Sequence, residues 1–196
     1  MINTIVLLLF LLVSSDLISQ EKIQKNDFCD SKWGMKKDKV LSTEKNKPIE
    51  AGPDNRYFLA VYTGEVAGLK MEYVYYFLDD VLVRGGYVLR EKHTNKNKYI
   101  DDYNKLKEIL TRKYGGPIKD DENWYNDRYK DRPQDYGLAV SIGYLVFQSG
   151  WETDRTLIHL TLMGDNYDIL STLHYISKLY KELIDKAEEK SREQGL

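Results

Sequence analysis

Histidine is the side chain that exported hydrolases and metalloenzymes most often use, and the chain of 196 residues contains three. His159 and His174 lie in two neighbouring apolar stretches that a turn signal separates. If Asp165 and Asn166 form a two-residue hairpin turn, both imidazoles lie on one sheet face, on a diagonal of roughly 7 Å. A register change of one residue would place them on opposite faces. Because a zinc centre needs three or four ligands, we expect histidines within the sheet and no metal site.

The third histidine and the only cysteine have simpler interpretations. His93 lies in the polar stretch REKHTNKNK, which is typical of a solvated loop residue. Cys29 has no second cysteine for an intramolecular disulfide and no histidine near it in the sequence to activate it. The residues before it are not the small apolar ones that precede a lipidated cysteine. We therefore expect a free thiol without a catalytic role.

Paired carboxylates could serve as the acid and base of a glycosidase, but each pair in this chain has a local explanation. The pairs are Asp79–Asp80, Asp101–Asp102 and Asp120–Asp121. We expect them at a hairpin turn, at the N-terminus of a helix and in an exposed loop, and adjacent residues on a strand point to opposite sides. The chain also lacks the GxSxG, HExxH, SxxK, P-loop and dinucleotide-binding patterns. We expect no catalytic residues and no cofactor, so an enzyme is the less favoured class.

Tryptophan, tyrosine and arginine gather in one polar stretch, residues 118–137, which we expect to be the longest irregular insertion. These side-chain types are enriched in protein interfaces. The candidate partner-binding residues are Trp124, Tyr125, Arg128, Tyr129 and Arg132. The alternative is that Trp124 only anchors a long loop in the core.

Residues 1–19 have the features of a secretory signal peptide. An unbroken apolar run from Ile5 to Val13 is followed by small serines, the last of which, Ser19, is the expected cleavage position. As a helix, this run would rise only about 14 Å, about half of the hydrocarbon core of a bilayer. We therefore expect export, to the periplasm or out of the cell, with no permanent membrane span after cleavage.

The charge of the chain is almost balanced, with 29 basic and 31 acidic residues spread along its length. Such a chain has no net field that would gather phosphate backbones. Nucleic acid is therefore excluded as an expected partner.

Periodic apolar residues divide the rest of the chain into helices and strands. A polar lead over residues 20–32 precedes a single α+β domain over residues 33–196, with its clearest helix from Lys98 to Tyr114. The order is helix, three strands, helix, loop, three strands, helix. This order predicts an antiparallel sheet of about six strands, which two helix-plus-three-strand halves could build, with the helices packed on one face. Gly85 and Gly86 lie in mid-strand and indicate a bulge or the close approach of another element.

Three short stretches carry a resemblance to exported bacterial proteins. In WGMKKDKV, Gly34 and Met35 followed by Val40 resemble a helix start of the SmpA/OmlA-like (BamE-like) outer-membrane assembly lipoproteins, whose small α+β fold is related in shape to β-lactamase inhibitory proteins. Together with LTRKYGGP and GWETDRTLIHL, the stretch is similar to uncharacterised exported bacterial domains that repeat a helix followed by antiparallel strands. The resemblance implies a fold and an envelope location, and no activity.

Taken together, these patterns predict an exported, non-enzymatic binding or interaction domain of the bacterial envelope, whose partner is a protein or another envelope component. The alternative is a small secreted hydrolase or a carbohydrate-binding domain that uses Trp124 or Trp151 beside nearby carboxylates such as Glu152.

Overall fold

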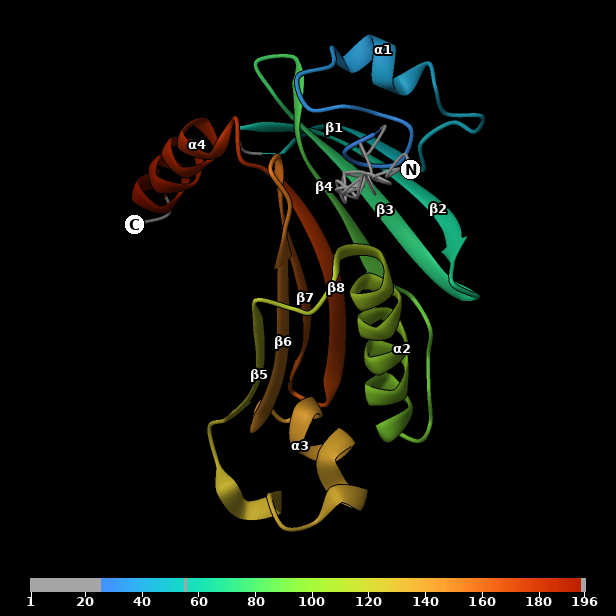
Figure 1. Ribbon diagram of the computed structural model, residues 1–196, viewed down its shortest axis with the longest axis vertical. Helices are drawn as coiled ribbons and strands as arrows, with labels where there is room; N and C mark the ends of the chain where they lie inside the picture. Colours follow the sequence, from blue (N-terminus) through green and yellow to red (C-terminus); the bar gives the residue numbers. More distant parts are fainter. Residues whose placement is uncertain (1–25, 55, 195–196) are drawn as a thin grey trace, which may run out of the picture.

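The computed structural model describes residues 26–54 and 56–194, with side chains up to residue 190 (Figure 1). The signal peptide expected over residues 1–19 and the first part of the polar lead lie outside the described residues. The described chain forms an α+β fold with one antiparallel sheet of eight strands.

The sheet consists of two four-stranded meanders, in the order β1-β2-β3-β4-β8-β7-β6-β5. The strands are β1 (Glu50–Asp54), β2 (Tyr57–Val66), β3 (Leu69–Leu78), β4 (Val81–Leu89), β5 (Lys119–Trp124), β6 (Leu145–Glu152), β7 (Thr156–Asp165) and β8 (Asp168–Ser177). The last strand of each meander lies in the middle of the sheet, where β4 pairs with β8. The first strands, β1 and β5, form the two edges. Figure 1 shows the first meander running obliquely to the second, as expected for a strongly twisted sheet.

The expectation of about six strands is wrong because both edge strands escape the alternation rule. β1 reads EAGPD and β5 reads KDDENW, and neither has alternating apolar residues. An edge strand needs only one neighbour, and proline or charge on it prevents pairing with other chains. The same finding corrects the expectation that residues 118–137 form one irregular insertion, since Lys119–Trp124 pairs along β6.

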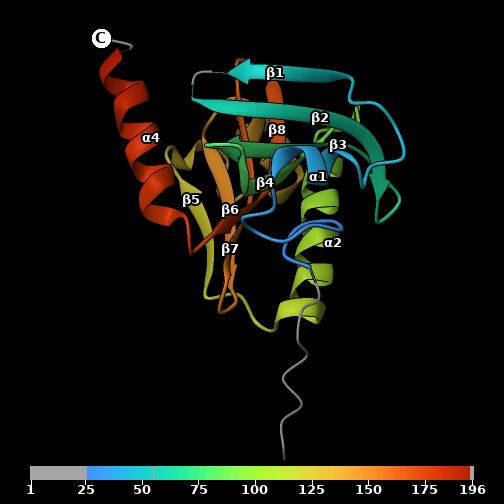
Figure 2. The ribbon, with the colours of Figure 1, turned by 90° about the horizontal axis from the view of Figure 1, so that it is seen from above.

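The sequence led us to expect all helices on one face of the sheet, and this expectation is wrong. They are α1 (Lys37–Leu41), α2 (Asn97–Tyr114), α3 (Tyr136–Ser141) and α4 (Lys181–Gln194), with 3-10 turns η1 (Asp127–Tyr129) and η2 (Pro133–Asp135). Leu173 and Tyr175 of β8 belong to the core cluster that contains α2, whereas Ile176 packs in a separate cluster with α4. Because neighbouring strand residues point to opposite faces, α2 and α4 lie on opposite sides (Figure 2). We call the side of α2 the helix face and the other side the open face.

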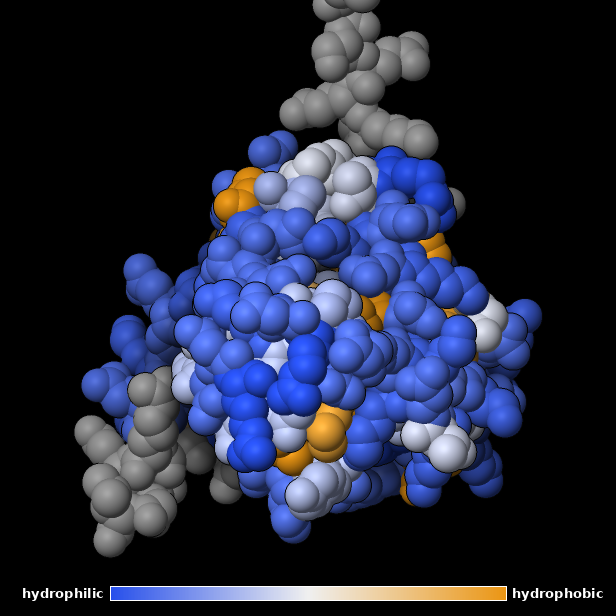
Figure 3. Space-filling model, turned by 90° about the horizontal axis from the view of Figure 1, so that it is seen from below, coloured by the Kyte–Doolittle hydropathy of each residue, from blue (hydrophilic) through white to orange (hydrophobic). Residues whose placement is uncertain are grey.

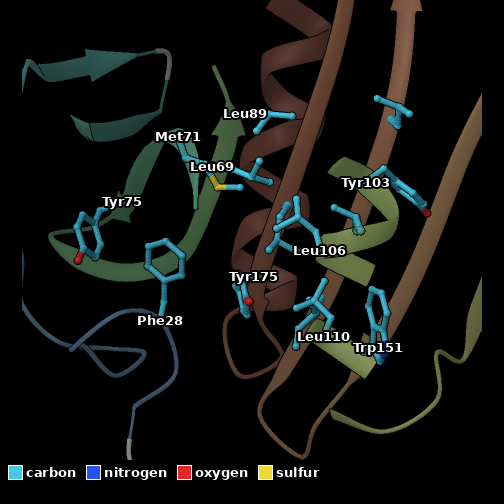
Figure 4. Packing of buried hydrophobic residues seen from close by; sticks show 14 of the residues in the cluster. Phe28, Leu69, Met71, Tyr75, Leu89, Tyr103, Leu106, Leu110, Trp151 and Tyr175 are labelled. Atoms are coloured by element: carbon cyan, nitrogen blue, oxygen red, sulfur yellow. The ribbon is translucent and has the colours of Figure 1, made fainter. Parts of the chain in front are cut away.

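The N-terminal segment Asp27–Trp33 is packed onto the helix face and closes the core there (Figure 4). The ring of Phe28 lies against Gly85 of β4, whose missing side chain leaves it room. The indole nitrogen of Trp33 donates to Thr156 Oγ1 at 2.9 Å. Asp27, only 5% exposed, accepts two hydrogen bonds of 2.9 Å from the guanidinium of Arg155. The predicted close approach at the glycine pair is therefore confirmed.

Replacing Gly85 with alanine should lower the free energy of unfolding by about 1–3 kcal/mol, the usual effect of overpacking a core. A Cβ at this position would lie 2.3 Å from the Phe28 ring, so the N-terminal segment would have to move. Urea unfolding measures the loss. Gly52→Ala is the matched control, because a Cβ at Gly52 has no atom within 4 Å and should change stability by less than about 0.5 kcal/mol. Equal effects of the two substitutions would contradict the packing.

Candidate functional site

The two sheet histidines are direct cross-strand partners on the open face. The hairpin turn between β7 and β8 is Asn166–Tyr167, one residue later than the Asp165–Asn166 turn that we expected. Asp165 therefore pairs with Asp168, and His159 lies directly opposite His174. The two imidazoles therefore share one face, a point that the sequence left open, and they form a direct pair instead of the diagonal of the Asp165–Asn166 register.

The surroundings of His174 do not suit metal binding. Arg84 Nη2 lies 3.2 Å from His174 Nδ1. A guanidinium can only donate, so Nδ1 accepts the hydrogen bond and the ring proton of neutral His174 is on Nε2. Neither nitrogen then offers a free lone pair. Among the described residues, no group of three or more His, Cys, Asp or Glu side chains could hold a metal ion.

Burial, and after it the charges of Arg84 and His159, lower the pKa of His174 to about 4. Burial also lowers the pKa of His159, with smaller contributions from Arg84 and Lys119. Both imidazoles are therefore neutral near pH 7, so two opposite histidines on this face do not repel each other. We interpret it as a structural element of the β7–β8 hairpin.

NMR titration should find the His174 midpoint near pH 4, and Arg84→Met should raise it, since it removes the second cause of the lowered pKa. An unfolded histidine binds its proton near pH 6.5, so between about 6.5 and 4 the unfolded state holds more protons. The contribution of His174 to stability is thus complete above pH 6.5 and is lost as the pH falls towards 4. His174→Gln should flatten this loss in urea unfolding, and a wild-type midpoint near 6.5 would contradict the assignment.

The expected partner-binding residues mostly bind one another. Trp124 is partly buried against the core and packs edge-on against Tyr136, with ring centroids 5.0 Å apart. The guanidinium groups of Arg128 and Arg132 lie 5.8 and 4.7 Å from the ring centroid of Tyr129. Tyr129 itself packs against the core. Tyr125, Arg128 and Arg132 are exposed, and Tyr125 has 74% of its surface exposed.

Trp151 is not available to a sugar ligand, which corrects the carbohydrate-binding alternative at this residue. It is 1% exposed, and its indole nitrogen donates to Gly115 O at 3.0 Å. Glu152 lies at the end of the same strand, 3.8 Å from Lys178. The tryptophan therefore closes the core at the C-terminus of α2, and the glutamate is a surface ion-pair residue.

A hydrogen-bonded group of catalytic residue types, which the sequence reading missed, joins α2 to β5 and β6. Ser149 Oγ donates to Asp120 Oδ1 at 2.7 Å and is 2.6 Å from Tyr103 Oη. Lys107 Nζ donates to the same carboxylate at 2.8 and 2.7 Å. Burial raises the pKa of Tyr103 to about 12, so its phenol is neutral. Because Ser149 is 2% exposed, its hydroxyl cannot reach a substrate, and the group fastens the edge strand to the helix.

Cys29 contacts tyrosines rather than a base. Its Sγ lies 3.3 Å from Tyr87 Oη, and burial raises the pKa of the thiol. Nearby, Tyr73 Oη donates to Glu44 at 2.8 Å, and Tyr75 donates to the same carboxylate. Burial also raises the pKa of these two phenols. The cysteine is free, as expected, and its thiol is protonated at neutral pH.

A cleft of about 670 Å³ lies between the connection from β4 to α2 and the end of the β7–β8 hairpin. Its walls come from two segments, residues 89–99 and 163–170. They are linked where Lys96 Nζ donates to Tyr167 O at 2.7 Å. His93 lines this cleft and is not the solvated residue that we expected, since its Nε2 lies 2.6 Å from Asp102 Oδ2. Figure 3 views the molecule from this end, where apolar residues appear as small patches in a mainly hydrophilic surface.

The end of the hairpin carries a group of exposed apolar side chains beside this cleft. Met163 and Leu170 are cross-strand partners, 45% and 43% exposed. Tyr167, in the turn, is 63% exposed and has a φ of +70°. A type I′ turn usually has glycine at this position because a side chain there is strained. We call Met163, Tyr167 and Leu170, with Asp165 and Asp168, the hairpin surface.

The chain matches no family model, and neither the curated proteins nor the solved structures give a match. The resemblance to SmpA/OmlA-like proteins therefore stays a prediction. In the part of the chain that the structure describes, no helix has the length and apolar character needed to cross a membrane.

Proposed function

We propose that the protein is an exported binding domain without catalytic activity, and that it contacts a protein or another envelope component through the cleft and the hairpin surface. The observation that carries this proposal is that three exposed apolar side chains, Met163, Tyr167 and Leu170, gather at a cleft of about 670 Å³. Exposed apolar side chains that adjoin one another, rimmed by polar groups, are typical of interaction sites.

The backbone of Tyr167 supports the same proposal. A tyrosine with a φ of +70° costs more than glycine would, and its ring is exposed, so the strain is not offset by burial in the core. Lys96 stabilises the turn, because its Nζ donates a hydrogen bond to the carbonyl oxygen of Tyr167. A large aromatic side chain is therefore presented on a fixed backbone, which reduces the entropy that binding must overcome.

The absence of catalysis is proposed from the contacts of the reactive groups. The Nδ1 lone pair of His174 is occupied by Arg84, and Ser149 is buried within its hydrogen bonds to Tyr103 and Asp120. The Cys29 thiol has a raised pKa, so it is a poor nucleophile at neutral pH. The histidine and the serine are thus engaged within the fold, and the thiol is weakly reactive.

A photo-crosslinking amino acid in place of Tyr167, in cells that produce the protein, should give a discrete covalent adduct. The same amino acid in place of Leu179, which is 73% exposed at the other end of β8, is the matched control and should give none. Met163→Ser with Leu170→Ser should abolish the adduct and lower the urea midpoint only modestly, since the two residues are already 45% and 43% exposed. An adduct from position 125 and not from 167 would move the site to the aromatic and arginine cluster instead.

Export predicts a shortened chain. Mass spectrometry of the protein recovered from outside the cytoplasm should give a mature N-terminus at Gln20, if cleavage follows Ser19. Replacing Leu8 with arginine should block export, because a charge interrupts the apolar run. Leu8→Val is the control and should be processed normally. Recovery of the chain with its first nineteen residues in the cytoplasm alone would reject export.

A further inference from the structure

We infer that the hairpin surface binds an extended protein segment in which a basic residue is followed, two positions later, by an aliphatic one. This inference rests on the proposed function and adds the chemistry of the partner. It is drawn from the charges and apolar contacts of the hairpin end.

The two aspartates at the end of the hairpin face each other without a cation between them. Asp165 and Asp168 are cross-strand partners and both are exposed. Like charges directly opposite in a sheet destabilise it. Among the described residues, neither carboxylate has an ion-pair partner within 4.0 Å. Other aspartates, such as Asp80, Asp120 and Asp127, do form ion pairs. A basic group from a partner would relieve this repulsion.

Within the described part of the chain, no cation of the cleft forms an ion pair with either aspartate. Arg90 is paired with Glu72 at 2.5 Å, and Lys96 donates to the Tyr167 carbonyl oxygen and lies over the Tyr167 ring. Lys92 lines the opposite wall, on the segment that follows β4. The hairpin surface therefore has a negative end, next to the exposed pair of Met163 and Leu170.

The spacing of these groups fits an extended peptide. Along β7, Asp165 and Met163 are two residues apart on one face, and Asp168 and Leu170 repeat this arrangement on β8. Side chains two residues apart in an extended peptide lie on one face, so a basic side chain between the aspartates would place the side chain two positions away against the methionine and the leucine. The apolar contact would supply affinity, and the charge contact would fix orientation.

The same charges argue against other occupants. A second copy of the chain meeting this surface about a two-fold axis would bring Asp165 and Asp168 against their own equivalents. Anionic lipid headgroups and nucleic acid would be repelled in the same way. A segment with basic and aliphatic residues is the chemistry that the surface complements.

Fluorescence anisotropy with short labelled peptides tests the inference directly on the mature chain. The probes are three eight-residue peptides with serine at every second position: a lysine–leucine peptide (Lys-Ser-Leu-Ser, repeated twice), a lysine–serine peptide with serine in place of leucine, and a glutamate–leucine peptide with glutamate in place of lysine. The lysine–leucine peptide should bind at least about tenfold more tightly than the other two, a difference of about 1.4 kcal/mol. Equal binding of all three, or preference for the glutamate peptide, would overturn the inference.

Substitutions locate the binding. Asp165→Asn with Asp168→Asn should weaken the lysine–leucine peptide about tenfold, and should raise the urea midpoint by removing the repulsion between the strands. The matched control, Glu108→Gln with Asp127→Asn, removes the same charge from side chains that are 74% and 72% exposed, and should leave binding unchanged. Equal weakening by both double variants would mean attraction without a site and would overturn the inference.

The partner chemistry can be rejected while the proposed function stands, and the two outcomes can be told apart. Adducts from position 167 together with no preference for the lysine–leucine peptide would reject this partner chemistry and keep the surface. Loss of the adducts together with a retained peptide preference at Asp165 and Asp168 would support the chemistry and reject the proposed cellular partner.

Discussion

The fold depends on the pairing between β4 and β8, because this pairing is the place where the two meanders become one sheet. Five residue pairs join the strands, from Arg84 opposite Ile176 to Val88 opposite Thr172. At the centre are two glycines whose missing side chains are filled from opposite sides. Phe28 occupies the space over Gly85 on the helix face, and a Cβ on Gly86 would lie 2.9 Å from His174 Nδ1 on the open face. The N-terminal segment also crosses the junction, since its Phe28 contacts β4 while Asp27 binds Arg155 beside β7. An unpaired carboxylate with 5% exposure would be costly, so this ion pair holds the segment in place.

The interior of the sheet could be predicted from the sequence, and its edges could not. Strands β2 to β4 and β6 to β8 have apolar residues in alternation, and α2 has one apolar stripe, so periodicity identifies them. β1 and β5 carry proline and acidic residues because they are edges, and no pattern distinguishes such strands from loops. The amphipathic pattern of α4 predicts that one side of it is buried. It does not say which face of the sheet buries it, because that choice depends on tertiary contacts.

Residue types alone drew attention to one segment of the chain and missed the cleft for the same reason. Arginines and aromatic residues in the segment from Trp124 to Arg132 have the composition of an interface, yet Arg128 and Arg132 lie over Tyr129. The cleft is built from residues 89–99 and 163–170, which become neighbours only through the pairing of β4 with β8. The register of the hairpin was also hidden, because Tyr167 takes the position at which glycine would have marked the turn.

The exposed apolar residues differ in whether they adjoin one another, and this difference is why we propose the hairpin end as the interaction site. Ile49, Ile118 and Leu179 are 58%, 69% and 73% exposed, more than Met163 or Leu170, but they come from three separate connections. Single exposed apolar side chains are ordinary on protein surfaces and need no partner. Met163 and Leu170 are opposite each other in one ladder, with Tyr167 at its end, so the antiparallel pairing makes one apolar surface of them. Contiguity rather than the exposure of any one residue is therefore what makes this surface suited to binding, and the pairing that creates it also sets the two aspartates beside it.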